Sequence, residues 1–315
     1  MQYGFGIDLG GTTVKLAFFK QDGTLLDKWE IPTDTSNAGV NILPDIAAAV
    51  KNYLLAKSIS AEDIIGIGIG IPGPVRPDGT VNRCVNLGWG VVNIEQTLFA
   101  LTGLPVAAGN DATVAALGEC WKGGGQGCDS MVFATLGTGV GGGIVIGGKV
   151  VHGVHGAGGE IGHMVLNREE TESCNCGKKG CVEQYCSATG IVRLAKKYLA
   201  KTNAPSSLRS IEPLTCKDVF DQAAAGDDAA KEILEQVYAY LGEFLANICN
   251  VIDPEAVVIG GGVSKAGQPL LDGVERHFKK WVMHAVSPVQ FSLAKLGNDA
   301  GAYGAFKLIL TKKGV

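Results

Sequence analysis

Short apolar runs bounded by glycine, proline, asparagine or aspartate predict the strands of this chain. These runs occupy residues 3–8, 14–19, 25–31, 64–71, 104–108, 131–136, 140–146, 149–154, 256–259 and 289–295. Between them, apolar residues recur every three or four positions, which is the spacing of a helix that is buried on one side. The predicted helices occupy residues 44–57, 93–102, 111–121, 187–200, 215–225, 228–250, 268–284 and the chain from Ala300 onwards. Helices that alternate with short strands indicate an α/β fold.

One order of elements occurs twice along the chain. A strand, a glycine-threonine loop, a second strand, a hairpin turn and a third strand fill residues 3–31 and again residues 131–154. This repetition indicates an internal duplication, and the glycine-rich residues 123–127 mark the boundary between its halves. We expect a small N-terminal α/β domain over residues 1–122, completed by the C-terminal helix 300–315. Residues 123–299 should form a larger α/β domain with the second glycine loop and a cysteine motif.

The strand predicted at residues 64–71 has glycine at every second position. Glycines that alternate along a strand leave one face without side chains, so another element can pack very close to the backbone there. We therefore expect a close neighbour on this face of the strand.

Composition narrows the class of protein. The chain has 315 residues, of which 46% are hydrophobic and 18% charged, and this excludes a disordered protein. A net charge of -4, without a run of basic residues longer than a pair, gives no reason to expect nucleic-acid binding. Glycines interrupt the longest apolar runs, so no membrane span is expected. Nine cysteines without a signal peptide indicate a reducing compartment, and we expect a cytoplasmic protein.

Three cysteines and one histidine have the spacing of a metal site. Cys174 and Cys176 flank one residue, Cys181 follows five positions later, and His163 lies eleven residues upstream of Cys174. Three thiolates and an imidazole make a closed, tetrahedral, structural Zn²⁺ site. Three small buried thiols or a disulfide pair are the simpler alternatives, and Cys186 could replace the histidine in a four-cysteine site.

Two loops have the composition of phosphate-binding loops. The first consists of Gly10, Gly11, Thr12 and Thr13, between two predicted strands. Its backbone N–H groups and hydroxyls can hold a phosphate, Lys15 can add positive charge, and Asp8 is placed to hold Mg²⁺ through water. The alternative is an ordinary hairpin.

The second loop contains Gly137, Thr138 and Gly139. Two such loops could hold one polyphosphate from opposite sides. This loop also fits the G-x-G-x-x-G dinucleotide pattern, but that pattern requires a helix after the glycines, and a strand is predicted here. A third glycine turn, with Gly261, Gly262 and Val263 after a buried strand, suits a backbone surface for adenine.

Four side chains are candidates for sugar chemistry. Asp111 begins a predicted helix and could remove the proton from a sugar hydroxyl during phosphoryl transfer, although an acid in this position often only stabilises the helix. Glu160 and Glu183 could each accept hydrogen bonds from a sugar ring or could be solvated loop acids. If a metal binds one nitrogen of His163, the other becomes a fixed N–H donor.

Together these motifs resemble the ROK family of bacterial sugar kinases and repressors, and in particular its glucokinases. The resemblance covers almost the whole chain. It rests on DLGGTTVK at 8–15, GIGIPGPV at 68–75, NDA at 110–112, LGTGVGGG at 136–143, GEIGH at 159–163, CNCGKKGC at 174–181 and LGNDAG at 296–301.

The resemblance implies an actin-like ATPase fold with a cleft between two domains, the use of ATP and Mg²⁺, and phosphorylation of glucose at its 6-hydroxyl by a homodimer. It implies Asp111 as the base and zinc on His163 and the three cysteines. The implied sugar contacts are Gly73, Asn110, Asp111, Glu160, His163 and Glu183.

Several alternatives stay open at this point. The substrate could be fructose, mannose, N-acetylmannosamine or N-acetylglucosamine, and polyphosphate could replace ATP as the donor. A sugar-sensing protein without catalysis is a further alternative, but Asp8, Lys15 and Asp111 argue against it because a sensor needs no base. ROK repressors carry a helix-turn-helix before the first strand, and with a strand predicted from residue 3 we expect none here.

Overall fold

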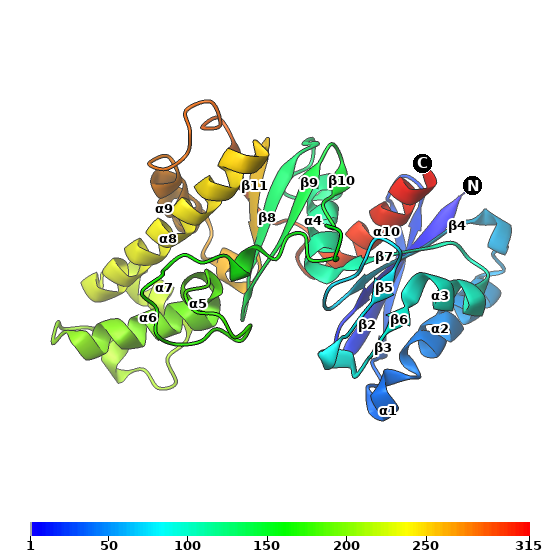
Figure 1. Ribbon diagram of the computed structural model, residues 1–315, viewed down its shortest axis with the longest axis horizontal. Helices are drawn as coiled ribbons and strands as arrows, with labels where there is room; N and C mark the ends of the chain where they lie inside the picture. The colour runs from blue at the N-terminus through cyan, green and yellow to red at the C-terminus, as the bar shows by residue number, and fades with distance from the viewer. Residues whose placement is uncertain (1) are drawn as a thin grey trace. The chain divides into compact units, whose positions relative to one another are not determined.

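The computed structural model describes residues 2–315. The chain forms two compact units (Figure 1). The first unit contains the residues up to Asp129 together with Gly143–Gly159 and Lys295–Val315, and the second contains Ser130–Gly142 and Glu160–Ala294. The domain boundaries proposed from the sequence stay a prediction, and the contacts group residues 143–159 with the first unit.

The first unit has a five-stranded sheet in the order β3-β2-β1-β4-β7. Its strands are β1 (Tyr3–Leu9), β2 (Thr13–Lys20), β3 (Leu25–Pro32), β4 (Ile64–Ile71) and β7 (Val106–Asn110). The pairs β1–β2 and β2–β3 are antiparallel, whereas β1–β4 and β4–β7 are parallel. Two short strands, β5 (Thr80–Val81) and β6 (Val92–Asn93), pair apart from this sheet and were not predicted.

The helices of the first unit are α1 (Ser36–Gly39), α2 (Ile42–Lys57), α3 (Ile94–Thr102), α4 (Asp111–Lys122) and α10 (Ala300–Lys313). Alternation along β1 assigns its two faces. Phe5 and Ile7 point into the hydrophobic core that α2 and α3 complete. Gly6 lies on the other face, where a Cβ atom would come within 2.0 Å of the carbonyl oxygen of Ala302 in α10.

The glycines of β4 confirm the close neighbour that the sequence predicted. A Cβ atom on Gly68 would lie 1.6 Å from the carbonyl oxygen of Ala305, which is also in α10. The C-terminal helix therefore packs directly on the backbone of two N-terminal strands. Figure 1 shows α10 beside these strands, with both chain ends in the same unit.

The second sheet has the order β10-β9-β8-β11-β12. Its strands are β8 (Met131–Leu136), β9 (Val140–Ile146), β10 (Lys149–Val150), β11 (Ala256–Gly260) and β12 (Gln290–Leu293). Strands β8, β9 and β10 lie next to one another in chain order. Strand β11 pairs with β8 on its other side, and β12 pairs with β11, both in parallel. This order repeats that of the first sheet, which confirms the internal duplication and the α/β prediction.

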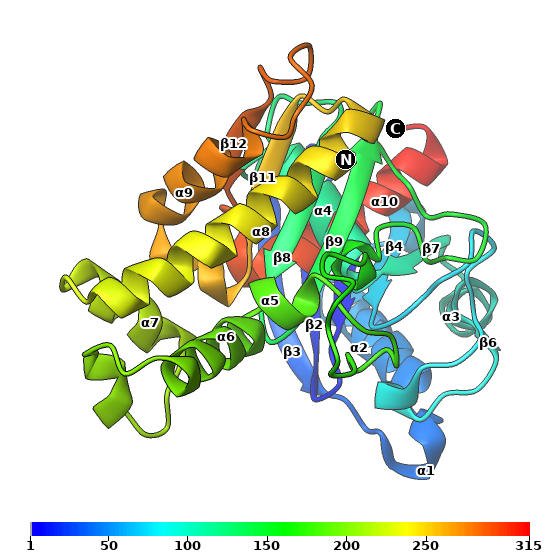
Figure 2. The ribbon, with the colours of Figure 1, turned by 60° about the vertical axis from the view of Figure 1, so that its left-hand side comes forward.

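The second unit also contains α5 (Glu183–Cys186), α6 (Ala188–Lys201), α7 (Cys216–Ala224), α8 (Asp228–Ile252) and α9 (Gln268–Phe278). In Figure 2, α8 runs beside α9 and α6 on one side of β8 and β11. Within the described residues, no helix combines the length and the apolar character that crossing a bilayer requires.

Three predicted elements are shorter than expected by three or more residues. One is the strand predicted at 289–295, which is observed only over Gln290–Leu293. The helix predicted to reach residue 284 ends at Phe278. After it the backbone tightens into turns, in which Lys280 and Trp281 donate to carbonyls three residues back, and the N–H of Met283 then donates to the side chain of Asn250 in α8 at 2.8 Å. The strand predicted at 149–154 ends at Val150. There Gly153 adopts a φ of +69°, which turns the chain out of the strand direction.

Candidate functional site: a cysteine–histidine centre and two glycine loops

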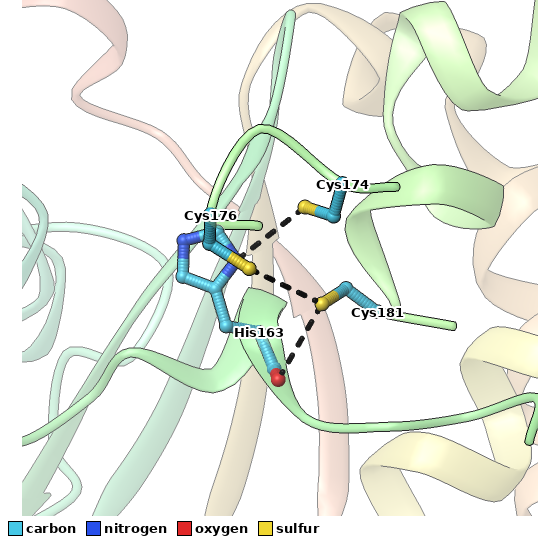
Figure 3. Close-up of side chains that lie close together, drawn as sticks. All are labelled: His163, Cys174, Cys176 and Cys181. Carbon is cyan, nitrogen blue, oxygen red and sulfur yellow. Dashed lines mark hydrogen bonds between the residues drawn. The ribbon is translucent and has the colours of Figure 1, made fainter. Parts of the chain in front are cut away.

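The predicted metal ligands come together in the second unit. One ligand atom from each of His163, Cys174, Cys176 and Cys181 lies within 4.8 Å of the other three. The Sγ atoms of Cys176 and Cys181 are 3.6 Å apart, and Cys174 Sγ lies 3.9 Å from His163 Nδ1. Figure 3 shows the three sulfur atoms and the imidazole ring turned toward a common centre. Three sulfurs and one nitrogen in this arrangement fit a tetrahedral Zn²⁺ ion.

Glycines shape the cysteine loop. Gly177 and Gly180 have φ values of +85° and +77°, which only glycine adopts readily. A Cβ atom on Gly180 would also lie 1.8 Å from the carbonyl oxygen of Asn167. The N–H of Cys174 donates to the carbonyl of Lys178 at 2.7 Å and closes the turn. The sequence therefore folds the three sulfurs inward through local backbone geometry.

Two of the three thiols resist ionisation. Burial raises the pKa of Cys181 to about 12 and also raises the pKa of Cys174, whereas a hydrogen bond from the backbone N–H of Lys178 lowers the pKa of Cys176. A divalent cation would offset this cost because thiolates, not thiols, bind metal.

The alternatives for the cysteine motif fit the geometry less well. An S–S bond is about 2.05 Å long, and within the described residues none of the nine cysteines forms a disulfide. Cys186 is fully buried at the end of α5 and is not part of the group. Burial moves the pKa of Cys186 far above its ordinary value, as expected for a thiol that packs as a small apolar side chain.

His163 and Glu160 lie at the edge of this centre. His163 turns Nδ1 toward the sulfur atoms, and its Nε2 atom lies 3.9 Å from Glu160 Oε2. Both side chains are partly exposed. The nitrogen that does not face the sulfurs is therefore directed toward a carboxylate and solvent, which is the arrangement that a hydroxyl-binding pair requires.

Glu183 lies between the cysteines and the second glycine loop. Its Oε1 atom is 3.5 Å from Cys174 Sγ, and its Oε2 atom accepts a hydrogen bond from the N–H of Val140 at 3.0 Å. A Cβ atom on Gly139 would lie 2.2 Å from the same oxygen. The glycine at position 139 thus makes room for the carboxylate. The spacing of the cysteines alone gave no sign of this contact.

An ion-pair network fixes the cysteine loop to α6. Arg193 contacts Glu170 at 2.5 Å and Glu172 at 2.8 Å, and the hydroxyl of Tyr185 donates to Glu170 at 2.6 Å. Burial raises the pKa of Glu170, but the hydrogen bonds from Arg193 and Tyr185 outweigh it, so the pKa lies well below its ordinary value. Gln184 accepts two backbone N–H groups, at residues 180 and 181. No motif in the sequence predicts this network.

In the first unit, Asn110 links Gly73 to the helix that carries Asp111. The amide of Asn110 donates to the carbonyl of Gly73 at 3.2 Å, and its oxygen caps α4 by accepting the N–H of Thr113 at 3.1 Å. Asp111 follows as the first residue of α4, half-buried, and accepts the N–H of Ala112 at 2.8 Å. Since Asn110 caps the helix, the carboxylate of Asp111 is not needed for that role.

The first glycine loop connects β1 and β2. The N–H of Gly10 donates to the carbonyl of Thr13 at 3.0 Å, and Gly11 has open space where a side chain would be. Lys15 lies 3.6 Å from Asp8. Burial raises the pKa of Asp8, and the neighbouring lysine offsets this only in part. A nearby divalent cation would favour the ionised form of this carboxyl group.

The third glycine turn borders a cavity in the second unit. The cavity has a volume of about 410 Å³ and a mainly apolar lining, which includes Gly262, Val263 and Phe220. A volume of this size can hold a flat heteroaromatic ring. Thr215 and Cys216 also line it, but they belong to no recognisable motif, so the sequence does not single them out as candidates.

Comparison with known proteins gives a consistent result. The model of the ROK family matches residues 4–312. A curated relative, the glucokinase of Halalkalibacterium halodurans, is 44% identical over 309 residues, which are 96% of this chain and 94% of that protein.

Solved structures are similar over the whole fold. A ROK family glucokinase from Streptomyces griseus, solved with glucose and AMPPNP, is 33% identical, with a TM-score of 0.73 and coverage of 97% of this chain and 98% of that one. The ROK hexokinase of Thermus thermophilus is 32% identical, with a TM-score of 0.80 and full coverage of both chains. This chain is therefore a member of the ROK family, and its two sheets of equal strand order are those of an actin-like ATPase fold.

Proposed function

We propose that this protein is a glucokinase that transfers the γ-phosphoryl group of ATP to the 6-hydroxyl of D-glucose. The observation that carries this proposal is the 44% identity to a curated glucokinase over nearly the full length. The Asn110–Gly73 hydrogen bond and the half-buried carboxylate of Asp111 supply the chemistry that such an enzyme needs.

Asp111 acts as the general base. Its carboxylate accepts the proton of the 6-hydroxyl as that oxygen forms a bond to the γ-phosphorus, and the bond from phosphorus to the bridging oxygen breaks to release ADP. Asn110 and Gly73 contact the sugar and fix its position, because the amide group of Asn110 already ties these two segments together.

The nucleotide contacts the glycine loops. The first loop, with Gly10, Gly11, Thr12, Thr13 and Lys15, and the second, with Gly137, Thr138 and Gly139, bind phosphate oxygens. Asp8 would hold Mg²⁺ through water, and the bound ion would supply positive charge beside the phosphates. Adenine occupies the cavity beside Gly261, Gly262 and Val263.

The cysteine–histidine group holds Zn²⁺ as a structural ion. The bound ion would fix the orientation of His163, so that its outward nitrogen donates to a sugar hydroxyl. Glu160 and Glu183 accept hydrogen bonds from the hydroxyls of the sugar ring. The donor set of three sulfurs and one nitrogen supports this assignment. The proposal extends to a cytoplasmic homodimer.

A hexose panel tests this function. The purified protein, with ATP and Mg²⁺, should give its highest kcat/KM with glucose among glucose, fructose, mannose and the N-acetylated amino sugars. Asp111→Ala should reduce kcat by orders of magnitude and leave glucose binding largely unchanged, whereas Asp63→Ala, at an exposed position, should match the wild type. Turnover retained in Asp111→Ala would remove this residue from its role. Binding without phosphorylation of any hexose would favour a sensor.

A further inference from the structure

The start of α6 contacts the second glycine loop at two backbone carbonyls. The N–H of Ala188 donates to the carbonyl of Gly137 at 2.8 Å, and the hydroxyl of Thr189 donates to the carbonyl of Thr138 at 2.8 Å. At the end of the loop, the N–H of Val140 donates to Glu183, as described above. Residues 183–189, the loop clamp, therefore hold the loop at three successive points.

These contacts decide which N–H groups of the loop remain available. The N–H of Gly137 donates to the carbonyl of Gly139 at 3.0 Å, and the N–H of Val140 is bound to Glu183. Among the described residues, the N–H groups of Thr138 and Gly139 have no hydrogen-bond partner. The loop therefore presents two adjacent donors.

Peptide geometry sets the direction of these donors. In a trans peptide, the N–H points opposite to the C=O of the preceding residue within one plane. The carbonyls of Gly137 and Thr138 point at α6, so the N–H groups of Thr138 and Gly139 point away from it. The hydrogen bonds to the two carbonyls therefore determine the direction of the N–H groups of Thr138 and Gly139.

Thr189 is suited to this positioning and to no other described role. Its side chain is exposed, lines none of the cavities above, and lies outside the proposed metal, sugar and nucleotide contacts. Besides the carbonyl of Thr138, the one hydrogen-bond partner of its hydroxyl in the described part of the chain is Ser187, at 3.0 Å. The methyl group of a threonine is not required for either contact.

We propose that Thr189 is a positioning residue for phosphate binding, because its hydroxyl fixes the peptide plane between Thr138 and Gly139 so that the N–H of Gly139 faces a phosphate oxygen. The inference deepens the proposed function, since it rests on the assignment of the second loop to ATP. Glu183, at the start of the clamp, is also a proposed sugar contact, whereas no contact joins the Thr189 hydroxyl to a sugar candidate within the described residues.

The test compares Thr189→Val, which removes the hydroxyl at nearly constant volume, with Thr189→Ser, which keeps it. Loss of one such hydrogen bond should weaken AMPPNP binding, measured by calorimetry, and raise the KM for ATP by about 2- to 10-fold. Glucose affinity without nucleotide and zinc content should stay at the wild-type level, and Thr189→Ser should restore ATP binding.

Each other outcome overturns the positioning role. Thr189→Val with normal ATP binding would show that the hydroxyl does not matter, and a serine variant as impaired as the valine variant would assign the effect to packing. Equal losses for glucose and ATP would indicate general destabilisation. Failure of the proposed function is distinct, because the wild-type protein would then not phosphorylate glucose at all.

Discussion

The carboxylate of Glu119 offers a sharp test of how the first unit is held together. Glu119 lies in α4 with its side chain fully buried. Its Oε2 atom accepts the N–H groups of Gly124 at 2.8 Å and Lys295 at 2.9 Å, and its Oε1 atom accepts that of Leu296 at 2.9 Å. One side chain therefore binds the segment after α4 to a segment about 170 residues further along the chain.

The substitution Glu119→Gln preserves the shape of the side chain and replaces one of its two hydrogen-bond-accepting oxygens by an NH₂ group. The amide oxygen can still accept the N–H groups of Gly124 and Lys295, but the NH₂ group then faces the N–H of Leu296. A buried donor left without an acceptor costs about 1–3 kcal/mol. In a unit of this size, each kcal/mol lowers the melting temperature by about 2–4 °C, so we expect a decrease of about 2–12 °C.

Glu119→Ala is less informative. It removes all three acceptors, and the resulting cost of about 3–9 kcal/mol approaches the whole free energy of unfolding of a typical domain. The assay is thermal unfolding followed by circular dichroism, with Glu62→Gln, at an exposed position, as the matched control. A melting temperature of Glu119→Gln within one degree of the control would refute this reasoning, because the N–H of Leu296 would then have another acceptor.

Two further predictions concern the cysteine loop. Cys176→Ser should lower zinc content, measured by mass spectrometry of the purified protein, and weaken glucose binding; full zinc content would show that the ligand assignment is wrong. Because the folded-state pKa of Glu170 lies below its unfolded value, its stabilisation is present above the ordinary carboxyl pKa and is lost as the pH falls. When the pH is lowered from about 7 to about 4, the free energy of unfolding of Glu170→Gln should therefore decrease less than that of the wild type. Urea unfolding of both proteins at the two pH values measures this. Equal losses would contradict this sign.

Features that depend only on residues close together in the sequence could be predicted from local patterns. The spacing of Cys174, Cys176 and Cys181 was enough to predict their convergence, since the glycines between them determine the turn. The alternating glycines of β4 likewise predicted a close neighbour. They could not identify α10 as that neighbour, because it lies more than 200 residues away in the sequence.

The rest depends on tertiary contacts that no short segment encodes. Beyond the end of α9 at Phe278, the N–H of Met283 donates to Asn250, which lies on another helix. The contact of Glu183 with Val140 spans 43 residues, and nothing near either residue predicts it. Phe220 lines the cavity beside Val263 only because α7 packs there.

The position of α10 has a consequence for synthesis. The helix covers bare glycine backbone on β1 and β4, yet it is synthesised more than 200 residues after them. The first sheet can pair early, but one of its faces stays uncovered until α10 has been made, although domains usually fold in the order in which they are made. The second unit lies between these two parts of the chain and can fold while the first waits. The sheet that is synthesised first is therefore completed after the second one.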